Sequence, residues 1–136
     1  MLLDTPDGAA ARIVAVAQAA YARGRGLGAR ETRLRRHVLL RNVARMRARS
    51  DDPGAFLEAV GSVFHLAHRR WYEVLHDRWS QSVHRALPEI RAKDPEFYRW
   101  LETLSGPAAP EARVVAAEAI LSHLFGVDPA DAGLAC

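Results

Sequence analysis

The sequence predicts an all-α protein, an irregular bundle of four to five helices around one long central helix. Three observations support this fold class: apolar residues recur at spacings of three and four, paired cap and proline residues mark helix starts, and no stretch alternates in the manner of a strand. A chain of 136 residues usually forms one domain and can bury roughly two thirds of its unfolded surface. We therefore expect a single helical domain.

The longest helical pattern covers residues 53–86 and contains four of the six histidines and two of the three tryptophans. Asp52 and Pro53 predict its start, because a carboxylate caps free N–H groups and proline is tolerated in the first turn. As one helix it would span roughly 50 Å, so we expect a break, either at Gly61 and Ser62 or at residues 80–82. Its expected apolar seam comprises Leu57, Val60, Val63, Phe64, Ala67, Trp71, Val74 and Leu75, and the expected core centre comprises Phe56, Val60, Phe64, Trp71 and Leu75.

A first helix and a linker are expected before the bundle. Thr5 and Pro6 predict a helix start, and the alanine-rich apolar pattern that follows should end near Arg23. The run Gly24, Gly26 and Gly28 then resists helix formation, because glycine loses the most backbone entropy on ordering. Residues 1–28 are therefore predicted to form a helix plus a Gly-rich linker that acts as a flexible hinge.

The remaining helices follow similar signals. A second helix is predicted over residues 29–49. Pro88 should interrupt the central pattern, and Asp94 with Pro95 should open another helix. A last helix should open at Pro110 and end at Gly126, a typical C-cap residue. The predicted bundle thus covers residues 29–126, and residues 127–136 are expected to be a frayed tail.

Composition favours a reducing, cytoplasmic setting. The single cysteine, Cys136, excludes an intrachain disulfide, and residues 1–10 contain two acids and no base, unlike a secretory or transit signal. No apolar run is long enough for a membrane span.

Positive charge is concentrated in one part of the chain. Residues 23–49 contain ten arginines and one acid, Glu31, a net charge of +9 in a chain whose total is +3. A GC-rich genome explains arginine in place of lysine but does not explain the clustering. Segregated charge of this kind favours an anionic partner.

The second predicted helix places these arginines opposite its apolar face. Leu39, Leu40, Val43 and Met46 share one side, and an i, i+4 ladder of like charges on the other costs a few tenths of a kcal/mol per pair without compensation. Leu34 and Val38 lie among the arginines, which suggests that part of this side is covered. The residues expected to bind an anionic partner are Arg30, Arg33, Arg35, Arg41, Arg45 and Arg49.

Two partners suit this helix: nucleic acid or an acidic protein surface. Arginines at turn spacing can follow a phosphate backbone with little sequence readout. A helix-turn-helix reader is disfavoured, because the following helix begins beside Asp51 and Asp52. A membrane surface is disfavoured by the lack of aromatic anchors. The ordinary alternative is a solvated face paired with acids from the rest of the chain.

A second group of residues, which we call the histidine flank, lies beside the apolar seam of the central pattern and comprises His65, His68, Tyr72, His76 and Trp79. A metal or haem site is the alternative hypothesis for this flank, with His65, His68, Glu73 and His76 as ligands. Residues eight apart on a straight helix are about 12 Å apart, so His68 and His76 need a sharp bend to share one ion. A structural role for these histidines, or a pH-responsive one, is the other interpretation. Tyr72 and Trp79 are predicted interface residues, which a homo-oligomer would use.

No nucleophile motif supports an enzyme. Glu73 and Asp77 could form a carboxylate pair, but Arg69, Arg70 and Arg78 make a salt-bridge network the better interpretation. The sequence thus predicts a small non-catalytic regulatory or adaptor protein without a cofactor, which binds nucleic acid or an acidic protein surface.

Overall fold

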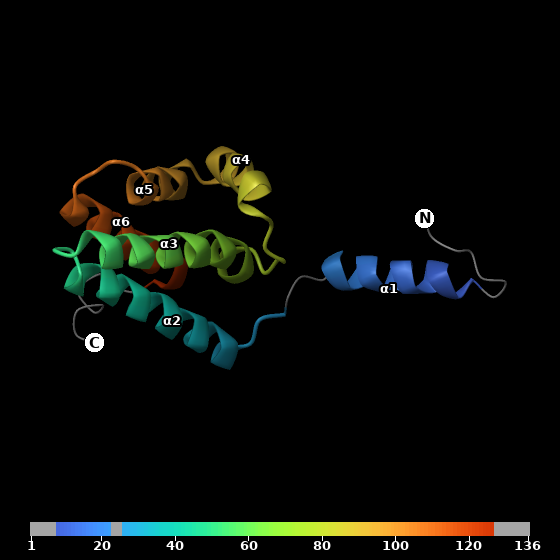
Figure 1. Ribbon diagram of the computed structural model, residues 1–136. Coiled ribbons are helices and arrows are strands. Elements are labelled where there is room, and N and C mark those ends of the chain that lie inside the picture. Colours follow the sequence, from blue (N-terminus) through green and yellow to red (C-terminus); the bar gives the residue numbers. More distant parts are fainter. Residues whose placement is uncertain (1–7, 23–25, 127–136) are drawn as a thin grey trace.

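The computed structural model describes residues 8–22 and 26–126 of the chain (Figure 1). These residues contain six α-helices, one π-helical turn and no strand, which confirms the all-α fold class. The elements are α1 (Ala9–Ala22), α2 (Ala29–Ala48), α3 (Pro53–Arg70), the π-turn η1 (Trp71–Leu75), α4 (Val83–Lys93), α5 (Pro95–Ser105) and α6 (Pro110–Phe125). No described helix is long and apolar enough to cross a membrane.

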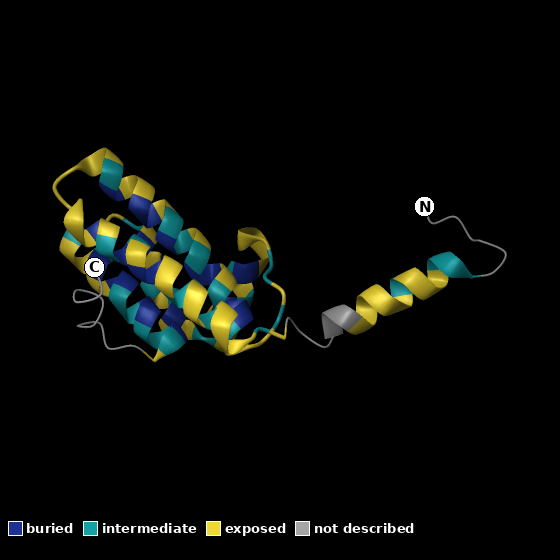
Figure 2. Ribbon diagram, turned by 90° about the horizontal axis from the view of Figure 1, so that it is seen from below, coloured by how far each residue is buried: buried dark blue, intermediate teal, exposed yellow. Residues whose placement is uncertain are grey.

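Five helices pack as a bundle, and the sixth stands apart. The central helix α3 contacts α2, α4, α5 and α6, and α6 also packs on α2 and α5. In contrast, α1 makes no extensive contact with any other described element and extends away from the bundle (Figures 1 and 2). The structure thus has six helices where four to five were expected, and five of them form the bundle. The largest fully buried side chains of the core include Trp71, Tyr72, Phe97, Leu39, Met46, Ile90, Leu101, Leu104, Ile120 and Leu121.

Proline and its preceding aspartate open two helices as the sequence predicts. The Asp52 Oδ1 atom accepts a hydrogen bond from the Ala55 N–H at 3.2 Å, and Asp94 Oδ1 accepts one from the Phe97 N–H at the same distance. Pro110 opens α6, and Gly126 ends it with a φ of 65°, the left-handed conformation of a C-cap glycine. The Thr5 and Pro6 signal and the predicted tail of residues 127–136 lie outside the described residues.

The predicted central helix is two helices. The helical pattern of residues 53–86 is interrupted over residues 76–82. Residues 80–82, one of the two expected break points, lie in this interruption. The other expected break point, Gly61 and Ser62, lies inside the continuous helix α3. Asp77 adopts a φ of 47°, in the left-handed region that aspartate tolerates better than most residues. This conformation cannot continue a helix.

The predicted seam fails after Arg70, where the π-turn replaces the α-helix. A π-helix bonds residue i to i+5 and needs more residues per turn than the α-helix that the seam assumed. Tyr72 and Glu73 are buried, whereas Leu75, the last residue of the π-turn, is 38% exposed. The prediction of Leu75 in the core centre was therefore wrong, and Tyr72, predicted at an interface, is buried within the bundle, where its hydroxyl meets Glu89 of α4.

Leu57 is also misplaced by the predicted seam, because it is 62% exposed. The buried arc of α3 is centred near Val63 and Ala67, about 100° from Leu57 at 100° per residue. Phe56, Val60 and Trp71 are buried in the core as expected, and Phe64 is partly buried against it.

Pro88 does not interrupt the chain where the sequence suggested. It lies in the second turn of α4, which begins five residues earlier at Val83. Proline there removes one intrahelical hydrogen bond, the one to the carbonyl of His84. His84 is exposed, so water can satisfy that carbonyl.

Candidate anion-binding face

The basic residues of α2 are positioned by the burial of its opposite side. Leu39, Leu40, Val43 and Met46 are buried in the core, which fixes the rotation of the helix on α3 and α6. The other side of α2 is exposed to solvent (Figure 2). We call this side the basic face; its charged members are Arg30, Arg33, Arg41, Arg45 and Arg49, and all five are exposed.

Most of the basic face has no counter-charge within the described chain. Arg30, Arg33, Arg41 and Arg49 take part in none of the salt bridges or side-chain hydrogen bonds of the described residues. Arg45 Nη1 donates only to the neutral side-chain oxygen of Asn42, at 3.3 Å. The acids in the rest of the bundle therefore do not neutralise this face.

Other arginines of α2 do have acidic partners. Arg47 forms a salt bridge with Glu118 of α6. Arg35 lies 3.6 Å from Glu73 Oε2 and 3.6 Å from Glu31 Oε2, and its side chain is only 18% exposed. Arg35, which the sequence grouped with the binding residues, therefore belongs to an internal ion-pair cluster and not to the basic face.

Two apolar residues interrupt the basic face. Leu34 is 61% exposed and Val38 is 37% exposed, so the cover that their position suggested is not provided by any described part of the chain. Beside them, a shallow depression of about 140 Å³ is lined by His37, Val38, Arg41, Asn42 and Arg45. The face is thus a basic surface with a small apolar centre.

The histidine flank does not converge on a point. The rings of His65 and His68 meet edge-on with centroids 5.6 Å apart, but His76 packs instead on Trp71 at 4.2 Å. Glu73 is engaged with Arg70 at 2.6 Å. No group of three potential ligands in the described residues is arranged to hold a metal ion, so the structure does not assemble the site proposed for His65, His68, Glu73 and His76.

His68 is buried in the bundle, with 2% of its surface exposed. Burial is the main cause that lowers its pKa, although a hydrogen bond between Nδ1 and the Phe64 carbonyl at 3.3 Å partly opposes the change. His76 also has a lowered pKa, chiefly from desolvation and then from the charges of Lys93 and Arg78. These environments favour the structural interpretation of the flank.

The predicted salt-bridge network around Glu73 is confirmed in part. Glu73 is 2% exposed and pairs with Arg70, as expected, and with Arg35 of α2, which was not foreseen. Asp77 has a different role: its Oδ1 atom accepts the Gly26 N–H at 2.9 Å and the Leu27 N–H at 3.4 Å. This carboxylate therefore ties the start of the bundle to the loop after η1.

Tyr72 and Trp79, the predicted interface residues, have different environments. Tyr72 is fully buried, and its hydroxyl donates to Glu89 Oε1 at 2.6 Å. Trp79 is 41% exposed at the surface. Glu89 also accepts from Lys93 at 2.6 Å, and the hydrogen bonds from Lys93 and Tyr72 lower the pKa of Glu89 to about 2.

Asp94 joins three elements in a way that the sequence did not reveal. Besides capping α5, it accepts the Trp71 Nε1–H at 3.0 Å and lies 2.8 Å from His123 Nε2 of α6. Burial alone raises its pKa, but the hydrogen bonds from Trp71, His123 and the Phe97 N–H outweigh it and hold the pKa below its ordinary value. Only its capping role had a local sequence signal.

Comparisons with protein-family models, with curated proteins and with solved structures found no match to this chain.

Proposed function

We propose that this chain is a small regulatory or adaptor protein that binds nucleic acid through the basic face of α2. The observation that carries the proposal is that five exposed arginines share one face of one helix and have no carboxylate partner in the described chain. Unpaired arginines on a rigid helix form a positive surface that attracts polyanions.

The length of the basic face suits a nucleic-acid backbone and not a single small anion. Arg30 and Arg49 are nineteen residues apart on the helix, which corresponds to roughly 28 Å. Along duplex DNA the phosphates of one strand are spaced about 3.4 Å apart, so a face of this length can contact several of them. Arginine also forms two parallel hydrogen bonds to a phosphate.

The helix dipole explains the arginines at the C-terminal end of α2 but not those in its first turns. Arg45, Arg47 and Arg49 lie at the C-terminal end of α2, where the helix dipole favours positive charge. Arg30 and Arg33 lie in the first turns, where the same dipole disfavours positive charge. Their clustering there is therefore better explained by an external anion than by helix stability.

We expect the basic face to contact the sugar-phosphate backbone of the nucleic acid. The depression near Arg41 is shallow. The helix that follows α2 is capped by Asp52, whose carboxylate repels phosphate. We therefore expect similar affinity for different sequences and a strong dependence on salt.

The test is fluorescence anisotropy with labelled duplexes of about 20 base pairs in two unrelated sequences, over a range of salt concentrations. If all five arginines contact phosphate, log K should fall with log salt at a slope of about −4.5. The double variant Arg41→Gln with Arg45→Gln should lower that slope by about 2.

A matched control removes the same charge elsewhere. Arg85 of α4 and Arg99 of α5 are exposed, and Arg85→Gln with Arg99→Gln should leave the slope unchanged. Equal effects of the two double variants would mean that only net charge matters and would contradict a specific face. Displacement of the duplex by polyglutamate at equal charge concentration would instead favour an acidic protein partner.

A further inference from the structure

The isolated helix α1 is apolar around most of its circumference. Its fourteen residues include one charged side chain, Arg12, one amide, Gln18, one phenol, Tyr21, and no acid. Ile13 is 69% exposed and Val16 is 67% exposed. An isolated helix of this length is marginal in water, so α1 needs a surface that covers these side chains.

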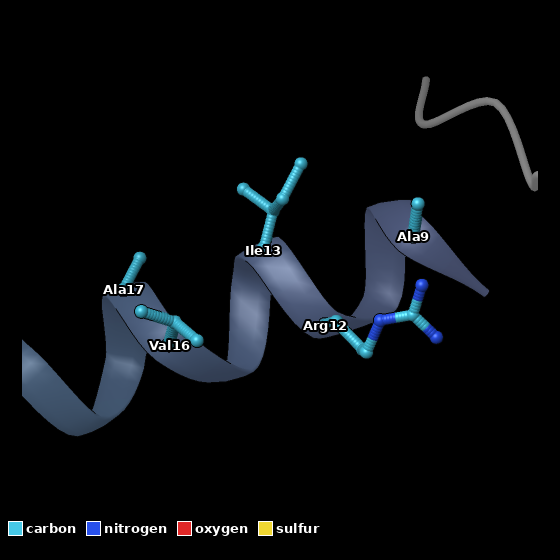
Figure 3. Close-up of a pocket in the computed structure, with 5 residues that line it drawn as sticks. All are labelled: Ala9, Arg12, Ile13, Val16 and Ala17. Atoms are coloured by element: carbon cyan, nitrogen blue, oxygen red, sulfur yellow. The ribbon is translucent and has the colours of Figure 1, made fainter.

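One stripe of α1 is suited to close helix packing. Ala9, Ile13 and Val16 follow one another at spacings of four and three, and together with Arg12 and Ala17 they line a broad open depression. Figure 3 shows that the Arg12 side chain points away from Ile13. Small residues beside Ile13 and Val16 allow another helix to approach closely.

The basic face of α2 carries the matching pair, Leu34 and Val38. We measure positions from the two helix ends that face the linker, Ala22 and Ala29. Val16 lies six residues before Ala22, about 9 Å along α1, and Leu34 lies five residues after Ala29, about 7.5 Å along α2. Ile13 and Val38 both lie nine residues from those ends, about 13.5 Å. An antiparallel α1 and α2 therefore pair Val16 with Leu34 and Ile13 with Val38.

We propose that α1 packs on the α2 of a second copy of this chain, and that the two copies exchange their α1 helices in a twofold dimer. In the structure α1 leads away from its own bundle, and Asp77 holds the backbone of Gly26 and Leu27 just before α2 (Figure 1). A second copy rotated about a twofold axis near the linker presents its α2 antiparallel to α1. Such an interface is self-complementary.

Area agrees with the exchange. A stable dimer buries on the order of 1,200–2,000 Å², which one short helix pair does not supply, and reciprocal exchange doubles the contact. Because Leu34 and Val38 lie among the arginines of the basic face, α1 docked there and a bound duplex compete for this face.

The first test is the mass in solution by sedimentation velocity over a wide concentration range. The expected species has twice the 15.0 kDa of one chain. Val16→Glu or Leu34→Glu should raise the dimer dissociation constant at least about tenfold, because each places a charge in the apolar contact. A monomer at every concentration would overturn the proposal.

Two control variants match these substitutions in residue type and exposure. Val115 of α6 is 66% exposed and Leu57 of α3 is 62% exposed, close to the values of Val16 and Leu34. Val115→Glu and Leu57→Glu should leave the dimer intact. If they weaken it as much as the test variants do, the interface lies elsewhere.

The second test fixes the register by cross-linking. In a Cys136→Ser background, Val16→Cys combined with Leu34→Cys should form a covalent dimer under mild oxidation, whereas Val16→Cys with Leu57→Cys should not. A cross-linked monomer would show that α1 closes on its own α2, and a ladder of larger species would show an open chain of copies; either result rejects the closed dimer. A monomer that sediments with phosphatidylglycerol vesicles through Ile13 would assign α1 to a lipid surface and also reject it.

Discussion

Replacing Asp94 with alanine should destabilise the bundle far more than the loss of a helix cap explains. The substitution removes the cap of α5, worth about 1 kcal/mol. It also leaves the indole N–H of Trp71, a side chain that is 1% exposed, without its acceptor, which costs about 1–3 kcal/mol. Loss of the His123 hydrogen bond adds about 1 kcal/mol, for a total of about 4 kcal/mol.

Asp52 provides the matched control, because it also precedes a proline and caps a helix. It is exposed, and among the described residues its side chain accepts a hydrogen bond only from the Ala55 N–H. Asp52→Ala should therefore lower the free energy of unfolding by only about 1 kcal/mol. Urea denaturation followed by circular dichroism measures both values, and equal losses in the two variants would refute the role assigned to Asp94.

The pH dependence of the free energy of unfolding gives a second comparison of the wild type with Asp94→Ala. The pKa of Asp94 is lowered from its ordinary value of 3.8 in the folded protein, so its ionised form stabilises the fold above that value. This stabilisation is lost as the pH falls through the lower, folded pKa. The difference in stability between the wild type and Asp94→Ala should therefore shrink in acid below about pH 4.

Two further predictions concern buried polar groups. Glu73→Gln should lower the free energy of unfolding, measured by urea denaturation, by about 3 kcal/mol, because Arg70 and Arg35 lose a buried counter-charge. Glu31 belongs to the same ion-pair cluster but its side chain is 58% exposed, so Glu31→Gln should change that free energy by less than about 1 kcal/mol. The pKa of His68 is lowered from 6.5, so the unfolded chain binds the extra proton first and stability should fall as the pH drops below about 6.5. His68→Gln should flatten that profile, and an unchanged profile would contradict the burial of a neutral imidazole.

The sequence by itself determined the fold class and most helix boundaries. Asp52, Asp94, Pro110 and Gly126 act through the backbone within a few residues, so their signals can be read locally. The exposed side of α2 was equally readable, because periodicity places Leu39, Leu40, Val43 and Met46 on one side and most of the arginines on the other. A helical pattern determines which side chains share a face.

The tertiary structure alone decided which charges on that helix are neutralised. Arg35 and Arg41 look alike in the sequence, but Arg35 meets Glu73, thirty-eight residues away, and Arg41 has no acidic partner in the described chain. Asp94 likewise meets Trp71 and His123 only because α3, α5 and α6 pack together. The π-turn also arises at this level, and Tyr72 and Glu73 within it are buried against the expectation from the α-helical pattern. Contacts between distant residues depend on how helices pack, and a local periodicity carries no information about them.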